Sequence, residues 1–167
     1  MRVILIPLAL CILVVTFDTR AGAQSRTATT TREPAEVVFV CEHGSVKSLV
    51  AMEQFNRKAR ERGLPYHAVA RGITPDRAVP EVVRAGLRAD GFDTSDFVPQ
   101  LLTSSDLDHA VLVVSFDEDV TKVTAGKVRH QAWDNLPGVL ADYPRGRAAI
   151  VVRIDSLVDE LARSGLQ

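Results

Sequence analysis

The chain has 167 residues, a usual length for one domain, and its 20 basic and 21 acidic residues give a net charge of −1. This balance gives no reason to expect nucleic acid or an anionic membrane surface as a partner. Three of the four histidines, His67, His109 and His130, lie far apart without the spacing of metal ligands. We therefore expect neither a metal ion nor another cofactor.

The first 23 residues have the layout of a secretory signal peptide. Met1-Arg2 provides a positive start, residues 3–17 are uncharged, and Ala21-Gly22-Ala23 is a small-x-small cleavage site. Cleavage after Ala23 would place the mature chain in the periplasm or outside the cell, with no membrane attachment. An uncleaved N-terminal anchor is the alternative interpretation.

A polar leader is predicted to precede the folded domain. Residues 24–35 are rich in Thr, Ser and Arg and show no apolar periodicity, which is typical of disorder. The folded domain is therefore expected to span residues 36–167. Because Cys11 lies in the predicted signal peptide, the mature chain would keep only Cys41. A lone cysteine in an oxidising compartment is either buried and inert or retained for its reactivity.

The predicted first strand, residues 36–40, ends at Cys41, and a helix is predicted over residues 45–62. The loop between them is short and contains Gly44, and Ser45 opens the predicted helix. A loop of this kind presents backbone N–H groups to an anion, and the helix dipole favours negative charge there. The same positive field favours the thiolate, which is the nucleophilic form of cysteine. This position favours a chemical role for Cys41 over that of an inert buried thiol.

Strands and helices alternate along the rest of the chain. Apolar runs predict strands, a spacing of three to four residues between apolar positions predicts helices, and a capping Thr or Ser predicts a short helical turn. The predicted strands are 66–70, 110–116 and 127–133, the predicted helices are 80–90 and 143–164, and the turn is 104–108. This alternation predicts a single α/β domain, a three-layer sandwich in which helices cover both faces of a four-stranded parallel sheet.

Val38-Phe39-Val40-Cys41, with the six-residue loop and Ser48 that follow, resembles the low-molecular-weight protein tyrosine phosphatases and the arsenate reductases that share their fold. Gly91-Phe92-Asp93-Thr94-Ser95 resembles the Gly-Ile-Asp-x-Ser segment of that family. Residues 111–119 resemble its apolar strand ending in Met-Asp. The resemblance covers residues 36–165, nearly the whole predicted domain.

The resemblance implies hydrolysis through a phosphocysteine, formed when the Cys41 thiolate attacks phosphorus. It implies that Ser48 hydrogen-bonds the sulfur and that the phosphate-binding loop consists of Glu42, His43, Gly44, Ser45, Val46 and Lys47. The family's loop reads Cys-x5-Arg-Ser, and Lys47 stands here at the arginine position. A guanidinium binds two phosphoryl oxygens with a planar fork, whereas an ammonium offers a point charge.

The resemblance also implies an aspartic acid that protonates the leaving group and then activates water. The family carries it in an Asp-Pro pair, which this chain lacks in its late loops. Asp134 is the favoured candidate because it follows the predicted fourth strand, at the edge of the sheet where Cys41 also lies. Asp142 is the alternative, but it precedes the last helix and could be its cap. Asp117 and Asp119 are interpreted as turn caps rather than as a cation site.

Three functions follow from these observations. The first is a phosphomonoester hydrolase of the protein tyrosine phosphatase type, whose partner is a phosphorylated small molecule or a phosphotyrosine protein. The second is a non-catalytic protein that binds phosphate or another oxyanion in the same loop. The third is an arsenate reductase that uses an external thiol, which is disfavoured because the mature chain holds no second cysteine for a thiol relay.

Overall fold

The computed structural model describes residues 33–118, 120, 124 and 126–164. The predicted signal peptide and the leader up to residue 32 lie outside the described residues. Within the described part, no helix has the length and hydrophobicity that crossing a membrane requires.

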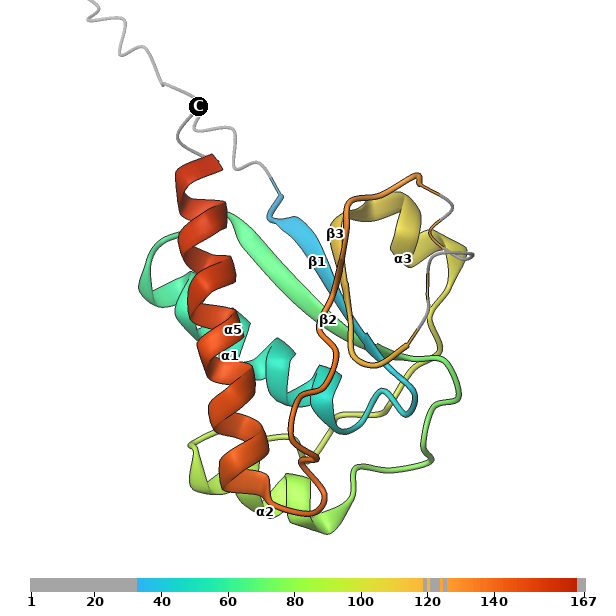
Figure 1. Cartoon of the computed structure of the whole chain (residues 1–167), viewed down its shortest axis with the longest axis vertical. Helices are drawn as coiled ribbons and strands as arrows, with labels where there is room; N and C mark the ends of the chain where they lie inside the picture. The colour runs from blue at the N-terminus through green and yellow to red at the C-terminus, as the bar shows by residue number, and fades with distance from the viewer. Residues whose placement is uncertain (1–32, 119, 121–123, 125, 165–167) are drawn as a thin grey trace, which may run out of the picture. The chain divides into compact units, whose positions relative to one another are not determined.

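Four parallel strands form the sheet, in the order β2-β1-β3-β4 (Figure 1). They are β1 (Ala35–Cys41), β2 (Tyr66–Gly72), β3 (Ala110–Ser115) and β4 (His130–Ala132). The strand β1 lies between two neighbours, and its residues 37–40 are fully buried. A parallel strand covered on both faces is apolar throughout, which is why this run could be predicted as a strand. The predicted four-stranded parallel sheet is confirmed.

All four strands differ from their predicted bounds, β2 by ending at Gly72 instead of residue 70 and β3 by ending at Ser115 instead of residue 116. The strand β1 begins at Ala35, inside the predicted leader, because the Ala35 backbone N–H donates to the Pro65 carbonyl at 2.9 Å. The prediction of a fourth strand over residues 127–133 was too long, since only His130–Ala132 pairs with β3. The preceding residues belong to a turn in which Gly126 has a φ of +70°, so pairing with β3 begins only at His130.

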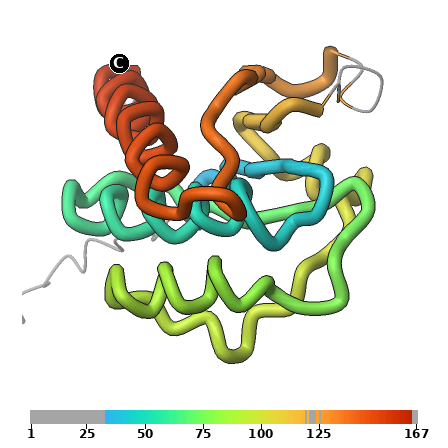
Figure 2. The backbone as a smooth tube through the Cα atoms, turned by 60° about the horizontal axis from the view of Figure 1, so that its bottom comes forward, coloured from blue at the N-terminus to red at the C-terminus, as the bar shows by residue number. Residues whose placement is uncertain are grey.

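Helices cover both faces of the sheet, as predicted. The helices α1 (Lys47–Glu61) and α5 (Tyr143–Ser164) pack together on one face (Figure 2). The helix α2 (Glu81–Ala89) contacts α5. The short helix α3 (Ser104–His109) contacts β1, and its Leu107 packs in the smaller core on the other face. The bounds predicted for the last helix are confirmed.

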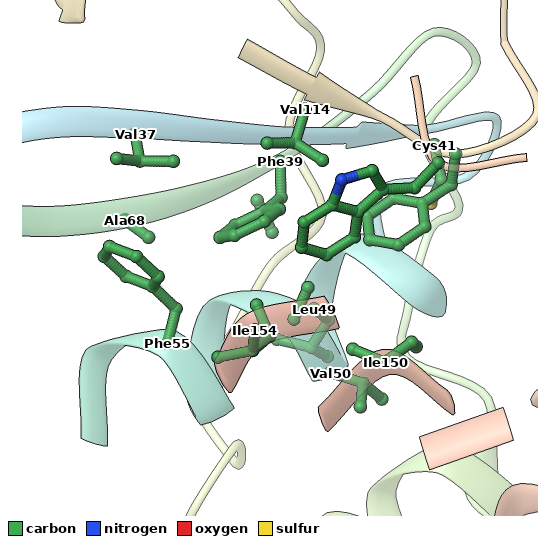
Figure 3. Close-up of a cluster of buried hydrophobic side chains, with 14 of the residues drawn as sticks. Val37, Phe39, Cys41, Leu49, Val50, Phe55, Ala68, Val114, Ile150 and Ile154 are labelled. Atoms are coloured by element: carbon green, nitrogen blue, oxygen red, sulfur yellow. The ribbon is translucent and has the colours of Figure 1, made fainter. Parts of the chain in front are cut away.

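The larger core lies between the sheet and the helices α1 and α5. Figure 3 shows Phe39 from β1, Leu49 from α1 and Ile154 from α5 meeting between the sheet and the helices, on one side of Cys41. Phe39 also contacts the Trp133 ring, at 5.9 Å between centroids. This packing fixes the end of β1 and the start of α1 relative to each other, and therefore fixes the loop that joins them.

Candidate active site

Cys41 is the last residue of β1, and its side chain points toward the start of α1. Its Sγ atom lies 3.1 Å from the Oγ atom of Ser48, which belongs to the first turn of that helix. Both residues are buried, with Cys41 6% exposed. A hydroxyl at this distance can donate a hydrogen bond to a thiolate and stabilise its charge. Catalysis by this pair remains a prediction, but the contact that it needs is present.

The loop between β1 and α1 turns at Gly44, where the backbone φ is +67°. The helix begins at Lys47 rather than at Ser45, because Val46 has a non-helical conformation with φ −119° and ψ −98°. Gly44 lies directly against the backbone of Gly72 at the end of β2. A Cβ atom on Gly44 would lie only 2.8 Å from the Gly72 nitrogen, so this contact requires glycine.

The segment after β2 forms hydrogen bonds with the same loop. The Thr74 N–H donates to the Glu42 carbonyl at 2.8 Å, and the Asp76 N–H donates to the His43 carbonyl at 3.1 Å. The Asp76 carboxylate accepts a hydrogen bond from the buried Ser45 hydroxyl at 2.5 Å and lies 3.4 Å from Nδ1 of His43. Asp76 therefore positions two residues of the loop. This role of Asp76 was not predicted from the sequence, because no pattern in the residues around it indicates a partner 31 residues earlier.

Lys47 reaches across the loop to the end of β3. Its Nζ atom donates to the Asp117 carboxylate and, at 3.4 Å, to the Leu136 carbonyl. The second Asp117 oxygen accepts a hydrogen bond from the Asn135 N–H at 2.9 Å. The interpretation of Asp117 as a turn cap is therefore incomplete, because its carboxylate also binds the Lys47 ammonium. Asp119 lies outside the described residues.

The two carboxyl groups that follow β3 have opposite electrostatic environments. Burial raises the pKa of Asp117, but the hydrogen bonds from Lys47 and Asn135 outweigh it, and the pKa lies below its usual value. The pKa of Glu118 is raised by burial and by the nearby negative charges of Glu42 and Asp117, against the opposing effect of His43. Asp117 is therefore a carboxylate that holds Lys47 in place, whereas Glu118 retains its proton to higher pH.

A cavity of about 230 Å³ opens over the thiol. The loop and the start of α1 contribute Cys41, Glu42, His43 and Lys47, the end of β3 contributes Asp117 and Glu118, and the segment before α5 contributes Val139 and Leu140. The cavity thus combines a thiol, one lysine, three acidic side chains and an apolar wall. Among the described residues, no group of three or more His, Cys, Asp or Glu side chains is arranged to hold a metal ion.

The two aspartates considered as general acids lie elsewhere. Asp134 is exposed and does not line the cavity that holds Cys41. Asp142 lies just before α5, where its carboxylate accepts a hydrogen bond from the Arg145 N–H at 3.0 Å, so it caps the helix. The cavity next to Cys41 is instead lined by three other acidic side chains, Glu42, Asp117 and Glu118.

A parallel α/β sheet whose central strand ends in a cysteine, followed by a tight loop and a helix that starts beside the thiol, defines a class of protein that binds oxyanions next to a nucleophilic sulfur. A sequence model of the low molecular weight phosphotyrosine protein phosphatases matches residues 36–136. The chain belongs to this family, and the resemblance noted in its sequence is confirmed.

Solved structures share the fold at low sequence identity. YfkJ from Bacillus subtilis is 16% identical, with a TM-score of 0.68 over 77% of this chain and 95% of that one. A low molecular weight protein tyrosine phosphatase from T. tengcongensis is 20% identical, with a TM-score of 0.66 over 75% and 98% of the two chains. A thioredoxin-dependent arsenate reductase from Corynebacterium glutamicum is 21% identical, with a TM-score of 0.65 over 80% and 64%. Among curated protein sequences, none matches this chain.

Replacing Lys47 by arginine is expected to tighten inorganic phosphate binding about tenfold, because a forked donor can contact two oxygens while keeping its partner Asp117. Isothermal titration of phosphate measures the change. Lys58→Arg is the matched control, since Lys58 forms an ion pair with Asp155 between α1 and α5. Equal affinities for wild type and Lys47→Arg would show that residue 47 does not contact the bound anion.

Proposed function

We propose that this chain is an exported phosphomonoester hydrolase of the protein tyrosine phosphatase type, acting through a phosphocysteine at Cys41. The contact between the Cys41 sulfur and the Ser48 hydroxyl, together with a cavity lined by Cys41 and Lys47, is the observation that carries the proposal. Family membership supports it, because the family acts on phosphate-containing substrates. The sequence of residues 1–23 supports export to the periplasm or the outside of the cell.

In the proposed reaction the Cys41 thiolate attacks phosphorus, so that a P–S bond forms as the P–O bond to the leaving group breaks. Backbone N–H groups of the loop and the Lys47 ammonium balance the charge of the phosphoryl oxygens. The leaving oxygen takes a proton from an acid in the cavity. Water then attacks phosphorus, the P–S bond breaks, and the Ser48 hydroxyl stabilises the departing thiolate.

The apolar wall of the cavity favours an aryl phosphate over a small polar ester. Val139 and Leu140 line the cavity, and an aromatic leaving group bound there would contact them. The proposed substrates are therefore phosphotyrosine in a protein or a phosphorylated aromatic small molecule.

A second candidate function, oxyanion binding without turnover, is favoured by one observation. The Lys47 ammonium is already engaged by Asp117 and by the Leu136 carbonyl, so its charge is partly neutralised before any anion binds. Two arsenate reductases share the fold, but Cys41 is the only cysteine among the described residues. A thiol relay would then need its second thiol from another molecule.

Rapid quenching of the purified protein with an aryl phosphate separates these functions. A burst of released phenol, together with a phosphoryl group on the peptide that contains Cys41, is the expected result. Phosphate binding without either signal would instead support the oxyanion-binding protein. Arsenite formation that depends on added thioredoxin or glutathione would support the reductase.

A further inference from the structure

Glu118 occupies the same edge of the sheet as Cys41. It follows β3, which pairs with β1 so that Val40 lies opposite Ser115. The carboxyl ends of neighbouring parallel strands lie at one edge, where ligands bind in sheets of this type. Glu118 and Cys41 both line the cavity, and Glu118 is half-buried there.

The neighbours of Glu118 favour its protonated form, whereas those of Asp117 favour the anion. Glu42 and Asp117 place negative charge near Glu118, and burial acts in the same direction, so its pKa is raised; His43 is the group that opposes this. Asp117 is held as a carboxylate by Lys47 and the Asn135 N–H. When the environments of two neighbouring acids shift their pKa values in opposite directions, the two side chains are suited to different roles. One can donate a proton, and the other acts as a fixed negative charge.

We propose that Glu118, rather than Asp134, protonates the leaving group in the reaction at Cys41. The inference rests on the proposed phosphatase function. As the P–O bond breaks, the Glu118 carboxyl proton moves to the leaving oxygen, and Glu118 becomes a carboxylate. In the second step that carboxylate takes a proton from the water that attacks phosphorus, and the P–S bond breaks to release phosphate. Glu118 then carries a proton again and Cys41 is a thiolate, so the cycle is closed.

The test compares leaving groups in Glu118→Gln, Asp134→Asn and wild type. Phenyl phosphate needs a proton on its leaving oxygen, whereas dinitrophenyl phosphate does not. Glu118→Gln is expected to lower kcat/KM about 100-fold for phenyl phosphate and only slightly for dinitrophenyl phosphate, because kcat/KM reports the first step alone. Hydrolysis of the phosphocysteine is common to both substrates and affects kcat. Glu118→Asp should restore part of the phenyl phosphate rate. Asp108→Asn, on the exposed surface of α3, is the matched surface control.

The pH profile adds a readout that a purely structural role would not change. With phenyl phosphate, kcat/KM of the wild type should fall as the pH rises through the pKa of Glu118, because the proton donor is lost. Glu118→Gln should lack this fall and be slow throughout. With dinitrophenyl phosphate, wild type and variant should share one profile, since neither needs the acid.

Three outcomes would overturn the inference. An equal fall in kcat/KM for both substrates in Glu118→Gln would give Glu118 a role in binding or folding only. A selective loss with phenyl phosphate in Asp134→Asn, and not in Glu118→Gln, would assign the acid to Asp134. If wild type formed no phosphocysteine even from dinitrophenyl phosphate, the proposed function would fail and this inference with it. In the first two cases phosphocysteine still forms, so failure of the inference is distinguishable from failure of the function.

Discussion

Replacing Cys41 by alanine is expected to reduce aryl phosphate hydrolysis by at least about 10³-fold, because removing the nucleophile leaves only charge stabilisation and binding to assist the reaction. The loop N–H groups and Lys47 stay in place, so inorganic phosphate should bind within a few-fold of the wild-type affinity. Steady-state hydrolysis and phosphate titration measure the two effects separately. Cys41→Ser should behave in the same way, with a weaker nucleophile of nearly the same size.

Chemical modification provides an independent check of the same assignment. Cys41 is the only cysteine among the described residues, and Cys11 lies in the predicted signal peptide. Iodoacetamide should therefore inactivate the mature protein by labelling one peptide, and phosphate should protect it by covering the thiol. Substantial activity in Cys41→Ala, or in the fully alkylated protein, would rule out Cys41 as the nucleophile.

Replacing Gly44 by alanine is expected to lower both phosphate affinity and turnover by about 10²-fold or more. The new Cβ atom would lie 2.8 Å from the Gly72 nitrogen and 3.1 Å from the Arg71 carbonyl carbon. Both are backbone atoms, so neither can rotate away, and the loop must move off the end of β2. A displacement of this kind would carry the loop N–H groups away from the anion that they are proposed to bind.

Gly63→Ala is the matched control for this prediction. Gly63 follows α1 and has a φ of +62°, close to the +67° of Gly44, but a Cβ atom added there would meet nothing within 4 Å. It should lose about 1 kcal/mol of stability from backbone strain and keep its activity. Thermal unfolding of both variants measures the cost of backbone strain, which the two positions share. Aryl phosphate hydrolysis measures the effect of the steric clash, which is expected only at Gly44. Equal activity losses in the two variants would contradict a special role for the Gly44–Gly72 contact.

The sequence by itself determined the features that depend on neighbours along the chain. The apolar run of β1, the small residues of the loop and the start of α1 are contiguous, so the distance between Cys41 and Ser48 is set within a stretch of eight residues. The bounds of α5 follow from the apolar period of one helix. Local propensity and periodicity act over such short spans, which is why fold class and candidate nucleophile could be predicted.

Only the tertiary structure decided which distant side chains meet at the thiol. Lys47 and Asp117 are 70 residues apart, and Ser45 and Asp76 are 31 apart. These pairs exist because the strand order β2-β1-β3-β4 brings the ends of β2 and β3 to either side of Cys41. Asp134 and Glu118 both follow strands and look equivalent in the sequence, yet only Glu118 lines the cavity. A side chain's direction at the end of a strand is set by the packing of the next segment, which no local pattern encodes.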